Sequence, residues 1–265
     1  MWAEDITNKQ HSVAMLNYHH YTGDVANPAL LIIHGLFGSA KNWRAIGQRL
    51  ADSYSVYIVD LRNHGDSPWF DTHCYTDMAD DLAKFIDTKA PAMHVLGHSM
   101  GGKAAMMLGL TRPQIVDKLI LADIAPVSYQ HDQLRYINAL KRLDLTSIQS
   151  RADAQNGLAA EIEDPTLSAF FLQSLDVATK KWKFNLDVLA RAMPDILAFP
   201  DVANRFEKDC LFLSGADSDY VTAAMRPQIK ARFPKARLAK IPKAGHWLHA
   251  DRPAAFEAAV RAFLG

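Results

Sequence analysis

The chain has 265 residues, of which 49% are hydrophobic and 22% are charged, and its net charge is zero. This composition is typical of a globular protein of one or two domains, and it excludes a disordered, collagen-like or disulfide-dense chain. Proteins that bind nucleic acids or anionic lipid surfaces usually carry a basic excess. We therefore expect a small, weakly charged ligand and neither a nucleic-acid nor a membrane partner.

The cysteine content and the first residues bear on the compartment. The two cysteines, Cys74 and Cys210, form neither a CxxC motif nor a disulfide framework, so a reducing compartment is expected. Residues 1–10 contain two acids and lack the apolar region of a signal peptide. The apolar runs are well short of the ~18 residues that a membrane span requires. These features predict a cytoplasmic protein and leave its oligomeric state open.

Short apolar runs alternate along the chain with helical patterns. Strands are predicted at residues 29–33, 55–59, 93–96, 118–122, 210–213 and 237–241. Helices are predicted at residues 42–51, 75–88, 100–110, 221–233 and 253–264. Nearly continuous apolar strands separated by helices are typical of a mostly parallel, doubly wound α/β sheet.

The alternation stops between residues 127 and 205. This stretch contains helical patterns, large apolar side chains and no convincing strand. It predicts a helical cap inserted after the strand that ends near Asp123, while residues 1–126 and 206–265 form the core. Such an insertion is best placed over the carboxyl ends of the strands, where α/β sheets bind ligands.

Residues 97–101 read Gly-His-Ser-Met-Gly between a predicted strand and a predicted helix. This is the G-x-S-x-G pattern of a nucleophile elbow, in which a sharp turn exposes the serine hydroxyl. Gly97 and Gly101 leave room for the close crossing of strand and helix. We therefore predict Ser99 as a catalytic nucleophile.

The same segment also fits the beginning of a phosphate-binding loop. Gly97 and the pair Gly102-Lys103 match G-x-x-x-x-G-K, and the apolar run before Asp123 resembles a strand that ends in a magnesium ligand. That loop needs Ser or Thr after the lysine to hold the metal, and Ala104 has only a methyl group. The elbow is the better interpretation, and Lys103 is expected to be structural and to point away from Ser99.

Two further motifs complete a hydrolase site. Residues 34–38, His-Gly-Leu-Phe-Gly, follow a predicted strand, where serine hydrolases place one backbone donor to the oxyanion. We predict the N–H groups of Leu36 and Met100 as the two donors, and His34 as a buried histidine that holds the loop.

His246 follows the last predicted strand, within Gly245-His246-Trp247. A neutral imidazole is the natural base for a hydroxyl, and this position completes the order serine, acid, histidine. His246 and His249 are spaced as a metal pair could be, but no cluster of Cys, Asp or Glu lies near them in the sequence. We expect no metal and no cofactor.

Six stretches together carry a family resemblance: residues 34–39, 60–67, 97–103, 123–127, 182–185 and 245–250. With these stretches in this order, the chain resembles the α/β-hydrolase superfamily, specifically the small YbfF-type esterases and their mitochondrial relatives. The resemblance implies the α/β-hydrolase fold, a helical cap over the site and hydrolysis of carboxylic esters without a cofactor. The residues expected to bind substrate lie in these stretches and are Phe37, His98, Trp182 and Trp247.

The acid of the triad is open on chain order alone. Many α/β-hydrolases carry it after the penultimate strand, which offers Asp217 and Asp219. The YbfF-type esterases place it in the motif D-I-x-P-V, which corresponds to Asp123. The resemblance favours Asp123, and the remaining aspartates suit a turn or a helix cap.

The resemblance implies that the stretch from Asp60 to Ser67 forms a tight turn after a strand, with Arg62 paired to a carboxylate. These residues are not expected to be catalytic.

The predicted function is that of a serine hydrolase that cleaves uncharged carboxylic esters of short to medium chain through an acyl-serine. A thioesterase or a C–C bond hydrolase would use the same side chains and is kept as an alternative. The non-enzyme alternative is a ligand-binding receptor that retains the hydrolase pocket.

Overall fold

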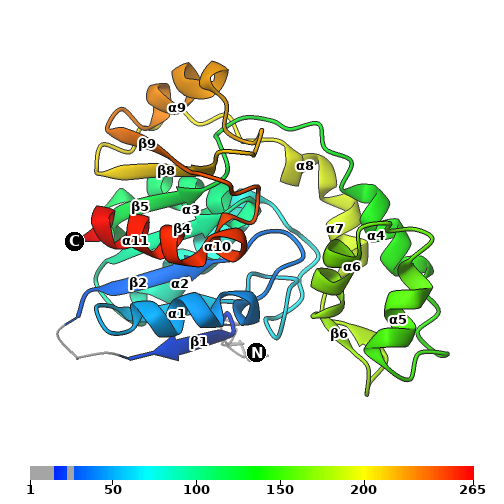
Figure 1. The fold of residues 1–265 in the computed structure, drawn as a ribbon. Coiled ribbons are helices and arrows are strands. Elements are labelled where there is room, and N and C mark those ends of the chain that lie inside the picture. The colour runs from blue at the N-terminus through cyan, green and yellow to red at the C-terminus, as the bar shows by residue number, and fades with distance from the viewer. Residues whose placement is uncertain (1–14, 23–26) are drawn as a thin grey trace, which may run out of the picture.

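The computed structural model of the protein describes residues 15–22 and 27–265. Its centre is a seven-stranded sheet with the order β1-β3-β2-β4-β5-β8-β9 (Figure 1). Only β1 runs antiparallel to its neighbour within this sheet. The strands are β1 (Tyr18–Tyr21), β2 (Ala29–Ile33), β3 (Ser55–Val59), β4 (Met93–His98), β5 (Val116–Ala122), β8 (Cys210–Gly215) and β9 (Ala236–Ile241).

Helices cover both faces of the sheet (Figure 1), which confirms the predicted doubly wound architecture. One face packs α2 (Tyr75–Asp87), α3 (Met100–Thr111) and α9 (Arg226–Arg232), and the other packs α1 (Arg44–Leu50), α10 (Leu248–Asp251) and α11 (Pro253–Leu264). Met78, Leu82 and Phe85 are buried along one face of α2, as a helical period requires. Short 3-10 turns lie at Ala40–Trp43, Pro113–Ile115 and Ala223–Met225.

Between β5 and β8 the chain leaves the sheet and builds a separate helical layer beside it (Figure 1). Its elements are α4 (Leu134–Arg142), α5 (Arg151–Leu158), α6 (Pro165–Leu172), the hairpin strands β6 (Leu175–Asp176) and β7 (Lys181–Trp182), α7 (Leu186–Arg191) and α8 (Met193–Leu197). We refer to residues 127–205 as the cap. Cap side chains face the loops that follow β2, β4 and β9, so the cap covers the carboxyl ends of these strands.

Three sequence expectations differ from the structure. Strand β1 was not predicted, because its Tyr-His-His-Tyr sequence has no apolar run and the strand pairs only with β3 at the sheet edge. The hairpin of β6 and β7 was not predicted because each strand has two residues. The first residues of the predicted helices at 42 and 221 lie outside α1 and α9, in 3-10 turns or extended chain.

None of the helices within the described ranges is long and apolar enough to cross a membrane. The prediction about a signal peptide concerns residues 1–10, which lie outside the described residues.

Candidate active site

Ser99 occupies a strained turn between β4 and α3. Its backbone angles are φ 53° and ψ −121°, in a region that L-residues rarely adopt. A Cβ on Gly97 would lie 2.4 Å from the carbonyl oxygen of Gly101, and one on Gly101 would lie 2.2 Å from that of His34. The N–H of Ser99 donates to Ala122 of the neighbouring strand at 3.1 Å. Both glycines are thus required by close backbone contacts, as the elbow pattern predicts.

Three loops bring Ser99, His246 and Asp123 into one hydrogen-bonded row. The distance from Ser99 Oγ to His246 Nε2 is 3.0 Å, and that from His246 Nδ1 to Asp123 Oδ2 is 2.8 Å. Because a carboxylate only accepts hydrogen bonds, Nδ1 carries the proton and Nε2 is free to accept from the serine hydroxyl. The three residues lie at the carboxyl ends of β4, β5 and β9, so the row crosses the edge of the sheet.

The carboxylate of Asp123 is fully buried and held in place from two sides. Oδ1 accepts from the backbone N–H of Gly215 at 3.0 Å, and Oδ2 accepts from the hydroxyl of Ser218 at 2.5 Å. Asp123 itself has a positive φ of 51°, a backbone conformation that L-residues rarely adopt. The loop after β8 therefore contributes donors that orient the carboxylate.

The alternative acids lie elsewhere. Asp217 and Asp219 are exposed, and among the described residues neither forms a hydrogen bond or ion pair with His246. The backbone N–H of Asp217 donates to the carbonyl oxygen of Ala244, as expected for a turn residue. Ser218, which lies between them, is the residue of this loop that points to Asp123.

A cavity of about 270 Å³ opens beside Ser99. Its core wall includes Leu36, Phe37, Met100 and Trp247, and its cap wall includes Tyr136, Leu167, Phe170, Phe171, Ile196 and Leu197. Within the described ranges, the backbone N–H groups of Leu36 and Met100 donate to no protein acceptor. These two N–H groups are therefore available as donors, and both residues line the same largely apolar cavity as Ser99.

The four predicted substrate-binding residues have different positions. Phe37, His98 and Trp247 line the cavity. Phe37 and Trp247 also contact the cap, with ring-centroid distances of 5.0 Å to Phe171 and 5.4 Å to Phe170.

Trp182 is not in the cavity wall, which corrects the expectation of a substrate contact. Its indole N–H donates to the carbonyl oxygen of Leu140 at 3.1 Å, so the ring packs inside the cap. A tryptophan in an apolar segment satisfies its one donor internally when it is buried, and the sequence gives no sign of which side it faces.

His98 lines the cavity, but its ring bonds the loop that carries His246. Its ring is 4% exposed, and Nε2 donates to the backbone carbonyl oxygen of His246 at 2.9 Å. Burial lowers the pKa of His98 well below its ordinary value, so the ring stays neutral.

Two contacts of the site were not anticipated. The ring of Tyr220 stacks on that of His246 with centroids 3.7 Å apart. Lys103 lines the cavity and is 1% exposed, so the expectation that it points away from Ser99 was wrong. A residue four positions after Ser99 returns to the same side of a helix, which the helical period could have indicated.

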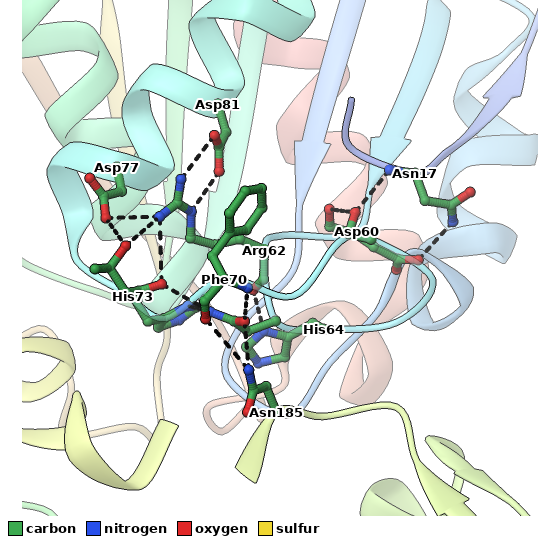
Figure 2. Close-up of polar contacts among 12 residues, drawn as sticks. Asn17, Asp60, Arg62, His64, Phe70, His73, Asp77, Asp81 and Asn185 are labelled. Atoms are coloured by element: carbon green, nitrogen blue, oxygen red, sulfur yellow. Dashed lines mark hydrogen bonds and ion pairs between the residues drawn. The ribbon is translucent and has the colours of Figure 1, made fainter. Parts of the chain in front are cut away.

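The turn after β3 is held by ion pairs and hydrogen bonds to neighbouring elements of the core. Figure 2 shows Arg62 between two carboxylates of α2, with Nε 2.6 Å from Asp81 and Nη1 2.8 Å from Asp77. Asp60 accepts hydrogen bonds from the backbone N–H groups of Ala40 and Asp66 at 2.7 and 2.9 Å. This confirms the predicted tight turn and the pairing of Arg62 with a carboxylate.

The same turn also holds the cap. Asn63 is buried with a positive φ of 65°, and its carbonyl oxygen accepts from the backbone N–H of Asn185 at 3.0 Å. The side-chain amide of Asn185 donates to Asn63 Oδ1 at 3.1 Å. Two of the six motif stretches, far apart in the sequence, are thus in direct contact.

His34 has the structural role expected of it. The ring is fully buried, Nδ1 donates to the carbonyl oxygen of Gly35 at 2.8 Å, and Nε2 accepts from the N–H of Leu61 at 3.0 Å. It joins the loop that carries Leu36 to the turn after β3. Within residues 15–22 and 27–265, no group of three or more His, Cys, Asp or Glu side chains is arranged to hold a metal ion.

His249 is expected to make the free energy of unfolding depend on pH, and one substitution is expected to remove this contribution. Its ring stacks on that of Trp43 with centroids 4.0 Å apart, and burial lowers its pKa to about 3. Its Nδ1 is buried and has no hydrogen-bond partner among the residues that the structure describes. Between pH 6.5 and 3 the unfolded chain therefore binds a proton that the folded protein does not, so stability falls as the pH falls. His249→Phe keeps the stacking and removes this proton. Lowering the pH from 7.5 to 5 is expected to cost the wild type about 2 kcal/mol more than the variant.

Urea unfolding of both proteins at the two pH values measures this difference. Equal losses would contradict the neutral state of the His249 ring.

Comparisons with known proteins place this geometry in a family. Residues 30–259 match the family described as the Alpha/beta hydrolase family. A Mus musculus protein named sn-1-specific diacylglycerol lipase ABHD11 is 35% identical over 260 residues, which cover 94% of this chain and 85% of the relative. The Escherichia coli esterase YbfF is 35% identical over 243 residues, covering 90% and 93% of the two chains.

A solved structure of a marine microorganism esterase superposes with a TM-score of 0.90 at 36% identity, over 94% of this chain and 99% of that one. These matches confirm the predicted fold class and the resemblance to YbfF-type esterases. The names of the relatives also agree with the expectation of an enzyme that acts on esters. On the evidence of the family match and of relatives that share nearly their whole length, the chain belongs to the alpha/beta hydrolase family.

Proposed function

We propose that the protein is a serine hydrolase that cleaves carboxylic esters of short to medium acyl chain, with Ser99, His246 and Asp123 as its catalytic triad. The observation that carries this proposal is the row of hydrogen bonds from Ser99 to His246 at 3.0 Å and from His246 to Asp123 at 2.8 Å. It ends in an apolar cavity that an acyl group can enter.

In the first half of the reaction, Ser99 Oγ attacks the acyl carbonyl carbon and its proton passes to His246 Nε2. Asp123, buried and fixed by Gly215 and Ser218, stabilises the positive imidazolium that forms. The carbonyl oxygen becomes an oxyanion, and the N–H groups of Leu36 and Met100 are proposed to hold it. His246 then gives its proton to the alcohol oxygen, the ester bond breaks, and an acyl-serine remains.

In the second half, water takes the place of the alcohol. His246 removes a proton from this water, and the resulting hydroxide attacks the acyl carbon. Collapse of the second tetrahedral intermediate returns the proton to Ser99 Oγ and releases the carboxylic acid. The enzyme is regenerated without a cofactor.

The cavity supports an uncharged acyl group of limited length. Its walls are largely aromatic and aliphatic, and its volume of about 270 Å³ is just below the ~300–1,000 Å³ range of small-molecule sites. Burying each methylene there is favourable by ~0.8 kcal/mol until the chain no longer fits. The mouse relative is named a diacylglycerol lipase, which supports acylglycerols as one class of ester to test.

We also propose that residues 127–205 act as a cap domain on a core of residues 1–126 and 206–265, because the cap supplies one wall of the cavity. A cytoplasmic location is supported by Cys74 and Cys210, both of which are free thiols.

A panel of p-nitrophenyl esters tests the proposed function. The acetate, butyrate, hexanoate and laurate esters are compared with an acetyl thioester, using wild-type protein and the Ser99→Ala variant as control. We expect kcat/KM to be greatest for butyrate or hexanoate and to fall for laurate, with no turnover by the variant. Preference for the thioester would indicate a thioesterase, and the absence of turnover of any substrate would contradict an esterase.

A further inference from the structure

Lys103 is a buried cation that the proposed mechanism does not use. It lies on α3, the helix that begins directly after Ser99, and its backbone N–H donates to the carbonyl oxygen of Ser99 at 3.1 Å. Its side chain is 1% exposed. A lysine is rarely this buried without a carboxylate partner, so its position needs a physical reason.

The ammonium group of Lys103 binds the end of a cap helix. Nζ donates to the carbonyl oxygens of Leu197 at 2.8 Å and Ala198 at 2.7 Å, with that of Ile196 at 3.5 Å. Ile196 and Leu197 are the last residues of α8, and Ala198 is its C-cap. Carbonyls at this end of a helix lack partners within the helix and carry its partial negative charge. Figure 1 shows α8 as the cap helix drawn next to the core.

The two chain segments that connect the core to the cap meet at the end of α8. The backbone N–H of Tyr129, where the chain enters the cap, donates to the carbonyl oxygen of Leu197, where the chain leaves it, at 2.9 Å. Lys103 Nζ lies 4.8 Å from the ring centroid of Tyr129. From α2, the hydroxyl of Tyr75 donates to the carbonyl oxygen of Ile196 at 2.6 Å. We call residues 125–131 and 196–199 the cap stem.

The cap stem also reaches the catalytic histidine. The hydroxyl of Tyr129 donates to the backbone carbonyl oxygen of Tyr220 at 2.7 Å, and the ring of Tyr220 stacks on His246. A contiguous set of contacts therefore runs from Lys103 through the stem to the base of the proposed triad.

The cost of burying the Lys103 ammonium group argues that this residue positions the end of α8 rather than simply stabilising the fold. Among the described residues no carboxylate offsets the charge, and burial lowers the pKa of Lys103 to about 7. An apolar side chain of similar length would avoid this desolvation cost. What such a side chain would lose is the set of directed hydrogen bonds to three successive carbonyls, which fixes where α8 ends.

We propose that Lys103 is a positioning residue that anchors the cap stem to the nucleophile helix and thereby holds the cap wall of the acyl cavity over Ser99. Ile196 and Leu197 form part of that wall, so the end of α8 sets the space available to the acyl chain. The inference rests on the proposed function. It identifies which acyl groups depend on Lys103: those long enough to leave the core wall and contact the cap.

The Lys103→Met variant tests this inference because methionine fills the same volume without the charge. The matched control is Lys118→Met, which removes a lysine that donates to the last carbonyls of α11, Phe263 and Leu264, remote from the cavity. We expect the hexanoate-to-acetate ratio of kcat/KM to fall by about tenfold in Lys103→Met and to stay within about twofold in the control. An equal loss for both esters would overturn the proposal and indicate a merely structural role.

Two further measurements keep the test informative. Tyr75→Phe removes only the hydroxyl bonded to Ile196 and replaces Lys103→Met in the test if that variant does not fold. It is expected to lower the hexanoate-to-acetate ratio of kcat/KM by about threefold. Without any substrate, amide hydrogen exchange of residues 193–199 is expected to be about tenfold faster in Lys103→Met than in wild type or Lys118→Met.

Unchanged exchange in this segment would overturn the anchoring role. If wild-type protein hydrolyses no ester while exchange responds as expected, the proposed function fails and the anchor stands.

Discussion

Ser99→Ala is expected to lower kcat for a hydrolysed ester by about 10⁶-fold while the protein remains folded. The hydroxyl supplies the protein atom that becomes bonded to the acyl carbon in the first half of the proposed reaction. Alanine removes that atom and changes nothing else in the packing, because Cβ stays in place. Steady-state turnover of the p-nitrophenyl ester measures the loss, and circular dichroism verifies the fold.

Ser99→Gly serves as the matched control for strain. Glycine adopts φ 53°, ψ −121° at little cost, so this variant is expected to gain ~1–2 kcal/mol in the free energy of unfolding while it loses the same activity. A Ser99→Ala protein that retains a tenth of the wild-type kcat would contradict the role of the hydroxyl as nucleophile.

Asp123→Asn has the second largest expected effect, a loss of ~10⁴-fold in kcat. The buried carboxylate accepts the Nδ1 proton of His246 and balances the imidazolium charge. A neutral amide at the same place loses the charge, and its N–H₂ group favours the imidazole tautomer that cannot accept from Ser99. The loss therefore belongs in kcat, with little change in KM.

Asp217→Asn and Asp219→Asn are the controls for this assignment. Both side chains are exposed and contact the solvent rather than His246, so kcat is expected to stay within about twofold of wild type. Collapse of kcat in Asp217→Asn, with Asp123→Asn still active, would transfer the role of the acid to the loop after β8.

The sequence predicts the proposed nucleophile and base because their positions follow from local rules. The G-x-S-x-G turn requires glycines at 97 and 101, and a histidine after the last strand is adjacent to this turn in a parallel sheet. The acid was different, since chain order admits both Asp123 and the pair after β8. Choosing among them by physics requires knowing which loop folds over His246, and that depends on the contact of Asp123 with Gly215 and Ser218.

The contacts inside the cap and between the cap and the core could not be predicted from the sequence. Trp182 and Phe37 are both aromatic residues in motif stretches, but one packs inside the cap and the other lines the cavity. That distinction arises from how the helical layer docks on the core. Lys103 is a similar case, because its partners are carbonyl oxygens 93 to 95 positions away that have no side-chain signature.

The proposed reaction requires His246 to make the hydroxyl of Ser99 nucleophilic. Treating wild type and His246→Ala with a fluorophosphonate, followed by mass spectrometry of the digested protein, measures this property without assuming a substrate. We predict covalent labelling of wild-type protein at Ser99 within minutes and a rate at least ~10³-fold slower in the variant. Labelling at another residue, or equal rates in the two proteins, would contradict the role of His246 as the base that activates Ser99.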